Sequence, residues 1–178
     1  MNQLDTLTTF IQTHISAVNK NNTINIHIGK IISDQIFINK HTSTYIQTLL
    51  HTLENVPNVT IDTPQYIQSY CVNNTVFKIY SNKFVNYSYT TEYTTQLTYN
   101  NIDCKLTFMH MNTKPNVDSH YKYNLIEEQE EIIIHYKHYF DITIVKYVNS
   151  SYGINIIIYK PIDQTKLLPA ITSVLQLL

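Results

Sequence analysis

The densest group of potential metal-binding or acid-base side chains is an acidic run in the second half of the chain. The segment Glu127–Glu131 holds four glutamates, and on an extended strand Glu128 and Glu130 would point to one face. Carboxylate oxygens are the ligands that Mg²⁺ and Mn²⁺ prefer, so this pair could form a displaced metal site. The alternative, which we favour, is a solvated charged turn before a strand over 132–135.

A third candidate for catalysis is Asp141, a lone carboxylate in an otherwise apolar strand pattern. Its favoured role is structural, as a hydrogen-bonded carboxylate at a strand start. His135 and His138 lie three residues apart, which would place them on opposite faces of a strand. The sequence therefore predicts no zinc site at these histidines.

The other reactive side chains exclude several classes of enzyme. Cys71 and Cys104 are far apart and lack a Cys-x-x-Cys partner, so we expect two buried, reduced thiols in a cytoplasmic protein. The chain contains no glycine-rich phosphate loop, no nucleophile elbow and no kinase signature.

The length and the net charge of the chain limit the architectures and the partners that it can have. The 178 residues, 43% of them hydrophobic, predict one domain over 1–178 with a sizeable core. The net charge of −1 makes a broad basic face for duplex DNA improbable, although a local basic lining stays open. No apolar stretch approaches about 18 residues, so we expect no membrane span.

Three amphipathic helices are predicted to position these side chains. Apolar residues recur at spacings of three and four over 3–19, 41–55 and 165–178. Pro57 ends the second helix, and Pro169 is expected in the first turn of the third.

The rest of the chain is predicted to form mostly antiparallel strands, because the spacings between them are too short for helical crossovers. The fold class is therefore α+β. The candidate strands are 23–28, 35–38, 59–62, 66–72, 75–81, 85–91, 94–99, 102–110, 121–125, 131–135, 139–147 and 154–159.

The strands alternate in an unusual way, because their second face is polar or mixed rather than plainly charged. On the first strand Thr23, Asn25 and His27 alternate with isoleucines, and the segment from Lys105 to Met109 behaves similarly. Periodicity alone favours a curved sheet with helices on one face and a Thr- and Tyr-rich face in water. The alternative is an antiparallel β-barrel of eight or more strands with a polar interior.

The order of motifs resembles the triphosphate tunnel metalloenzyme family, specifically the RNA 5′-triphosphatase domain of large-DNA-virus mRNA capping enzymes. Residues 23–30 (TINIHIGK) are similar to the family's opening Glu-x-Glu-x-Arg-x-Gly strand, and Phe37 takes the next place. Residues 70–78 are similar to its turn segment. Residues 140–146 (FDITIVK) resemble its aromatic-x-Asp-Leu-Thr-x-Val strand, and 152–158 take the closing position. The resemblance implies a tunnel-like barrel with flanking helices.

The resemblance also implies where a metal would bind, and there the chain departs from the family. The glutamates of the family's first and last strands correspond to Thr23 and Asn25, and to Gly153, Asn155 and Ile157. None of these residues is a carboxylate, so we expect no metal cofactor. Mg²⁺ or Mn²⁺ would be needed only if the chain were active through displaced ligands.

The family's phosphate-binding Arg/Lys sleeve is thin in this chain. His27 takes the place of the expected arginine. Five lysines are its remaining candidates: Lys78, Lys105, Lys122, Lys137 and Lys146. The predicted ligand-binding lining of the barrel is Thr23, Asn25, His27, Lys78, Lys105, Lys122 and Asn155.

Three functions follow from this sequence. The first, which we favour, is a non-catalytic relative that serves as a binding or scaffolding subunit for the RNA 5′ end or for another capping or transcription subunit. The second is an active, divergent RNA 5′-triphosphatase, which requires three carboxylates converging inside the barrel. The third is an unrelated β-rich viral protein that binds a partner or single-stranded RNA through its 15 tyrosines. The expected location is the cytoplasm or a viral factory, with packaging in the virion as an alternative.

Overall fold

The computed structural model describes residues 3–19, 21–33, 36–72, 75–80, 83–85, 87–113, 124–160 and 162–178. Within these ranges it places the backbone alone at residues 3, 33, 70–72, 75–80, 83–85, 87–89, 112–113 and 124–127. The helices of the described residues are α1 (Gln3–His14), continued by the short 3₁₀ turn η1 (Ile15–Ala17), α2 (Ser43–Glu54) and α3 (Gln164–Leu177). None of them is long and apolar enough to cross a membrane.

In the described residues, eleven strands make up one antiparallel sheet. They are β1 (Asn22–Ser33), β2 (Ile36–Ile38), β3 (Val59–Ile61), β4 (Gln65–Val72), β5 (Thr75–Tyr80), β6 (Lys83–Val85), β7 (Tyr87–Tyr99), β8 (Ile102–Thr113), β9 (Asn124–Tyr136), β10 (Phe140–Lys146) and β11 (Tyr152–Ile158). The α+β class is therefore confirmed.

Local sequence explains where the helices begin and end. The Thr42 hydroxyl accepts a hydrogen bond from the Tyr45 backbone N–H and caps α2, and the Asp163 carboxylate caps α3 through the Thr165 N–H. Pro169 lies in the second turn of α3, one turn later than predicted. Its missing N–H leaves one carbonyl of the first turn without a helical partner.

Two of the expected strand boundaries are wrong. The segments 85–91 and 94–99 include most of β7, whose pairing with β8 shifts between Thr91 and Tyr93. A bulge of this kind keeps a strand continuous while it bends. The acidic run is not a turn either, because Glu127–Glu131 lies inside the long strand β9.

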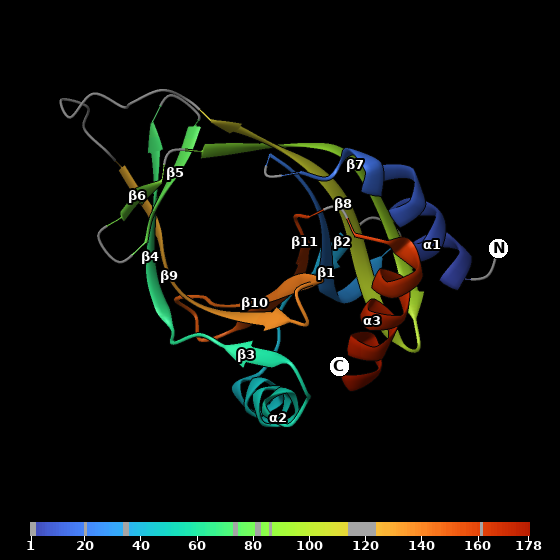
Figure 1. The fold of residues 1–178 in the computed structure, drawn as a ribbon. Helices are drawn as coiled ribbons and strands as arrows, with labels where there is room; N and C mark the ends of the chain where they lie inside the picture. The colour runs from blue at the N-terminus through green and yellow to red at the C-terminus, as the bar shows by residue number, and fades with distance from the viewer. Residues whose placement is uncertain are drawn as a thin grey trace.

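The sheet curls into a ring, with the helices outside it (Figure 1). Neighbouring strands follow the order β6-β5-β4-β9-β10-β11-β1-β8-β7, and β2 and β3 pair off this path. The ladder of hydrogen bonds is not closed in the described residues. The two end strands β6 and β7 are nevertheless consecutive in the chain, with one residue between Val85 and Tyr87. Chain continuity therefore joins the two ends of the ladder.

The two faces of this ring differ in polarity. The outer face carries buried isoleucines such as Ile26, Ile142 and Ile156, which pack in one core with Leu7 of α1 and Ile171 of α3. Side chains alternate along a strand, so the residues between these isoleucines point into the ring. The barrel with a polar interior therefore describes this protein, and the curved sheet with one face in water does not.

The two glycines of the chain occur where a side chain has no room. A Cβ at Gly29 would lie 2.1 Å from the Ile38 carbonyl oxygen and 2.9 Å from the Phe37 ring, where β1 pairs with β2. A Cβ at Gly153 would lie 2.6 Å from the Tyr147 hydroxyl. The first obstacle is backbone, whereas the second is the tip of a side chain.

We expect Gly29→Ala to lower the free energy of unfolding by about 1–3 kcal/mol, because the β1–β2 pair must separate to admit the methyl group. Gly153→Ala is the matched control and should cost less, since the Tyr147 ring can rotate away. Urea unfolding followed by circular dichroism measures both. Equal losses in the two variants would contradict the steric account of Gly29.

Candidate functional site

The register of the strands places most of the predicted lining residues on the inner face. On β1, Asn25 lies opposite Thr107 of β8, and His27 lies opposite both Lys105 of β8 and Asn155 of β11. Thr23 shares their face by alternation. Lys122 lies outside the described residues, and for Lys78 only the backbone, opposite Ser69 of β4, is described.

A hydrogen-bond network crosses four strands on this face. His27 Nδ1 lies 2.7 Å from Asn155 Oδ1, and His27 Nε2 lies 3.2 Å from Thr107 Oγ1. The Asn155 amide also donates to Thr143 Oγ1 of β10 at 3.5 Å. Thr107 and Thr143 are buried, with 3% and 5% exposed. The network therefore runs unbroken across β10, β11, β1 and β8.

Asn39 fixes the orientation of this network, and the sequence analysis missed it. Its amide nitrogen donates to Asn155 Oδ1 at 2.9 Å and to the Ile154 carbonyl at 3.1 Å. Its own oxygen accepts the Ile154 backbone N–H at 2.8 Å. Asn39 follows β2 by one residue, and no local pattern indicates that it bonds to a strand 115 positions away.

Asn25 is held in the same way on the neighbouring part of β1. It is 6% exposed, and its amide donates to Thr23 Oγ1 at 3.2 Å and contacts Met109 Sδ at 2.8 Å. Both inner-face asparagines that correspond to metal-binding glutamates thus use their amides to bond other protein groups.

The surroundings of His27 favour its neutral imidazole. Burial lowers its pKa below the ordinary value of 6.5, and the nearby Lys105 ammonium lowers it further, while the bond to Asn155 partly opposes both. The Asn155 oxygen can only accept, so Nδ1 carries the proton and Nε2 accepts from the Thr107 hydroxyl. The core of the network therefore contains no charged group.

Of the three carboxylates proposed from the sequence, Asp141 shares the inner face with Thr143 of β10 and lies opposite Ile157 of β11. The other two lie elsewhere. Glu128 and Glu130 do share one strand face, as predicted, but it is the outer face, because Glu130 lies opposite Lys146 of β10 and forms an ion pair with it at 3.3 Å. Lys146 is therefore not part of the lining either. Lys137 lies in the β9–β10 turn with its ammonium over the Tyr136 ring.

Glu131 also turns inward, whereas the sequence analysis assigned it to a solvated turn. It lies opposite Val145 of β10 and Gln65 of β4 and is 7% exposed. Asp103 shares the inner face at the end of β8. Its two oxygens accept the Thr98 hydroxyl at 2.5 Å and the Ile31 N–H at 2.8 Å.

The residues at the positions of the family's metal-binding glutamates do not fit the divalent metal that the resemblance implies. Asn25 and Asn155 offer neutral amide oxygens at most, and Gly153 and Ile157 offer no side-chain ligand. In the part of the chain that the structure describes, no group of three or more His, Cys, Asp or Glu residues is placed to hold a metal ion. The expectation of no metal is not tested by this, since several side chains lie outside that part.

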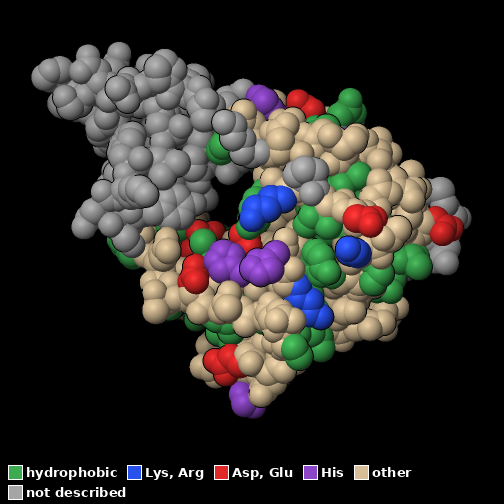
Figure 2. Space-filling model, in the orientation of Figure 1, with side chains coloured by type: hydrophobic (Ala, Val, Ile, Leu, Met, Phe, Trp, Pro, Cys, Tyr) green, Lys and Arg blue, Asp and Glu red, His purple; other side chains and the backbone are tan. Residues whose placement is uncertain are grey.

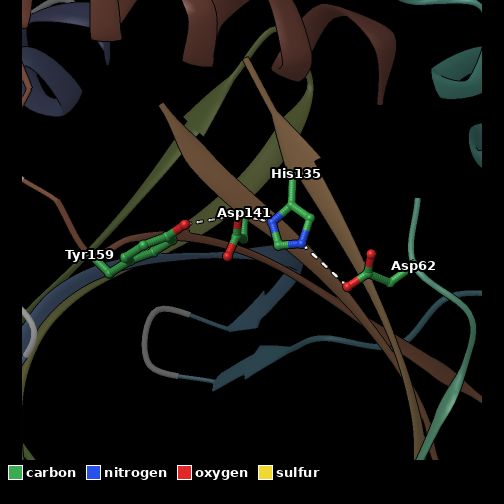
Figure 3. A network of polar contacts seen from close by, with 4 residues as sticks. All are labelled: Asp62, His135, Asp141 and Tyr159. Atoms are coloured by element: carbon green, nitrogen blue, oxygen red, sulfur yellow. Dashed lines mark hydrogen bonds and ion pairs between the residues drawn. The ribbon is translucent and has the colours of Figure 1, made fainter. Parts of the chain in front are cut away.

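A second polar network joins β9, β10 and the segment after β3 (Figure 3). His135 Nδ1 lies 2.7 Å from Asp141 Oδ1, its Nε2 lies 3.3 Å from Asp62 Oδ2, and the Tyr159 hydroxyl donates to Asp141 at 3.4 Å. Asp141 is thus a hydrogen-bonded carboxylate at a strand start, as the favoured interpretation had it. The bond to Asp141 is the main cause that raises the pKa of His135, and Asp62 adds to it.

The surface carries few charged side chains, in keeping with the 14% of charged residues in the sequence. In the view of Figure 2, acidic, basic and histidine side chains are interspersed, and no continuous basic patch covers the described residues on this face. Cys104 is fully buried and its pKa is raised to about 12, mainly by burial, so the thiol is inert. The Cys71 side chain lies outside the described residues.

The two histidines are expected to titrate on opposite sides of pH 6.5, with opposite effects on stability. The lowered pKa of His27 gives stability that is complete above 6.5 and is lost as pH falls. The raised pKa of His135 gives stability that is complete below 6.5 and is lost as pH rises through the raised value. NMR titration of the histidine resonances measures both.

Asp141→Asn should lower the pKa of His135 more than Asp62→Asn does, because the Asp141 contact is the shorter and dominant one. A His27 resonance that titrated above 6.5 would contradict the neutral network.

Comparison with known proteins finds solved structures with a similar fold. No protein-family model matches the chain, and no curated protein matches it significantly. Among solved structures, S. pombe Pct1 RNA triphosphatase matches 99% of this chain and 90% of its own, with 9% identity and a TM-score of 0.73. The same enzyme in complex with the Spt5 CTD matches 97% of this chain and 85% of its own, with 10% identity and a TM-score of 0.66.

A viral protein has the same arrangement. The mimivirus capping enzyme triphosphatase matches 98% of this chain and 97% of its own, with 10% identity and a TM-score of 0.61. These identities are too low to carry activity across, but the coverage is nearly complete in both directions. The chain therefore has the triphosphate tunnel fold, in a form that resembles the RNA triphosphatases of mRNA capping.

Proposed function

We propose that this protein is a non-catalytic relative of the capping RNA triphosphatases that acts as a binding or scaffolding subunit. The observation that carries the proposal is the neutral network on the inner face of the ring. Asn25 and Asn155 stand where the family has metal-binding glutamates, and their amides bond to Thr23, Thr143 and His27. The fold is retained while the charge at these positions is absent.

The physical argument concerns the charge of the substrate. Hydrolysis of a triphosphate end needs cations that neutralise its oxygens and a group that orients the attacking water. A neutral amide does neither. The twelve basic residues of the chain are all lysine, so no guanidinium is present to bind phosphate in a bidentate manner. Lys105 is the lysine whose described side chain lies on the inner face next to His27.

The comparisons support a partner in transcription or capping. The S. pombe RNA triphosphatase was solved in complex with the Spt5 CTD, so a protein with this fold can hold another component of that machinery. The proposal keeps the viral setting, in the cytoplasm or a viral factory, that the sequence resemblance implies, and the mimivirus capping enzyme triphosphatase is a viral protein with a similar fold. The RNA 5′ end is the other partner that this proposal includes.

A second candidate, an active and divergent triphosphatase, is favoured by one observation. Glu131 is a buried carboxylate on the inner face of the ring. Catalysis through displaced ligands would require further carboxylates beside it. The likeness in fold favours both candidates over an unrelated β-rich protein that binds single-stranded RNA.

Purified full-length protein should release no γ-phosphate from 5′-triphosphate RNA above background, with Mg²⁺ or with Mn²⁺. The expected reason is the absence of clustered carboxylates at the inner-face positions that correspond to the family's ligands. Release of radiolabelled phosphate, with a metal-dependent RNA triphosphatase as the positive control, is the measurement.

Two matched variants distinguish the candidates. Glu131→Gln removes the inner carboxylate, and Glu128→Gln removes a carboxylate from the outer face of the same strand. Metal-dependent release that Glu131→Gln abolishes and Glu128→Gln preserves would establish the active alternative and overturn the proposal.

A further inference from the structure

Two hollows on the outer face of the sheet share a pair of charged residues. The first, about 220 Å³, lies between α2 and the sheet and is lined in part by Leu50, Ile132 and Ile144. The second, about 590 Å³, reaches from the start of β4 to the turn between β10 and β11. Glu130 and Lys146 line both hollows. We call the two together the outer groove.

The polarity of the residues that line the outer groove changes along β9. Ile132, Glu130 and Glu128 alternate with inward residues and so point outward, about 6–7 Å apart. The α2 end combines apolar residues such as Leu50 and Ile132 with Ser43 and Gln47. The middle carries the Glu130–Lys146 pair, and the far end carries Glu128. A segment in extended conformation has the same two-residue spacing and could present side chains to all three positions.

The charged pair in the middle is accessible to a partner. Glu130 and Lys146 side chains are 43% and 45% exposed and lie 3.3 Å apart. Exposed pairs of this kind hold their two side chains only weakly, so a partner can compete for either of them. At the far end Tyr66 is 50% exposed, and Val148 in the β10–β11 turn is 77% exposed.

Glu128 is held in place as an anion. The Gln68 amide donates to its carboxylate at 3.0 Å, and the Tyr66 hydroxyl donates to it as well. These two bonds lower the pKa of Glu128. The described side chains of the groove thus carry two carboxylates against one ammonium, which leaves a net negative charge.

We propose that the outer groove binds an extended segment of a protein partner that carries one aromatic residue and, two to four positions away, lysine or arginine. The aromatic ring would occupy the α2 end, which exceeds the roughly 150 Å³ of an engineered cavity that binds benzene. The basic residues would face Glu130 and Glu128. The charge of the groove selects a cationic segment. This inference stands whether or not the inner face hydrolyses triphosphates, because the groove lies on the opposite face of the sheet.

Fluorescence anisotropy with two labelled peptides tests the proposal on the full chain. One peptide has the order Ser-Lys-Ser-Lys-Ser-Phe-Ser and the other the reverse order, since either direction of binding is compatible with the spacing. We expect saturable binding of one of them in the range of about 10–500 μM, typical of weak peptide recognition. Replacing Phe by Ser, or Lys by Glu, in the peptide should abolish it.

Variants of the protein locate the binding. Glu128→Gln with Glu130→Gln should weaken binding roughly threefold per carboxylate, as for exposed ion pairs. Glu92→Gln, which removes an exposed charge from β7, should leave it unchanged. Circular dichroism verifies that each variant is folded, and the three surface substitutions are not expected to disturb the core.

Two results would overturn the proposal. One is the absence of saturable binding of either peptide up to about 1 mM, or binding that is indifferent to the two glutamate substitutions. The other is self-association of the wild-type chain in sedimentation that the glutamate variants abolish, because a second copy of the chain would then occupy the groove.

Discussion

The difference in polarity between the two faces of the sheet determines the rest of this structure. The isoleucines of β1 alternate with Thr23, Asn25 and His27, and burial of the apolar set under α1 and α3 leaves the polar set no direction but inward. Once inside, these polar groups must find hydrogen-bond partners, because an unpaired buried donor or acceptor is costly. The network of His27, Asn155, Thr107 and Thr143 meets this requirement.

This network gives the ring interior a stable arrangement without a metal. In a site built from clustered glutamates, like charges repel, and a cation must hold them together. Here the amides of Asn25 and Asn155 each have a protein partner, and Asn39 adds a further restraint from outside the main ladder. The shape of the fold and the chemistry of its interior are therefore separable, and a chain can keep the first while it changes the second.

Much of the fold could be predicted from the sequence, because it follows from local patterns. The spacing of apolar residues located the three helices, and strict alternation located β1 and β11. The inward direction of Asn25, His27, Lys105 and Asn155 followed from alternation combined with the family resemblance.

The parts that escaped prediction depend on tertiary pairing. The acidic run resembled a turn, because a buried glutamate is rare, yet β9 continues through it and turns Glu131 inward. The bond of Asn39 to Ile154 and the contact of His135 with Asp62 likewise join residues that no local window contains. Lys146, at the end of β10, points to the outer face because it lies opposite Glu130 of β9. That register could not be read from the sequence.

The junction between β6 and β7 has a consequence for how the fold can vary. In a barrel closed by hydrogen bonds, strand number and stagger together fix the diameter, so one added residue disturbs the register of the whole ladder. Here the end strands β6 and β7 are not hydrogen-bonded to each other in the described residues, and they are consecutive in the chain. The length of that single connection can change while every strand pair described above keeps its register. An insertion at this one place would therefore lengthen the connection and leave the described strand pairs in register.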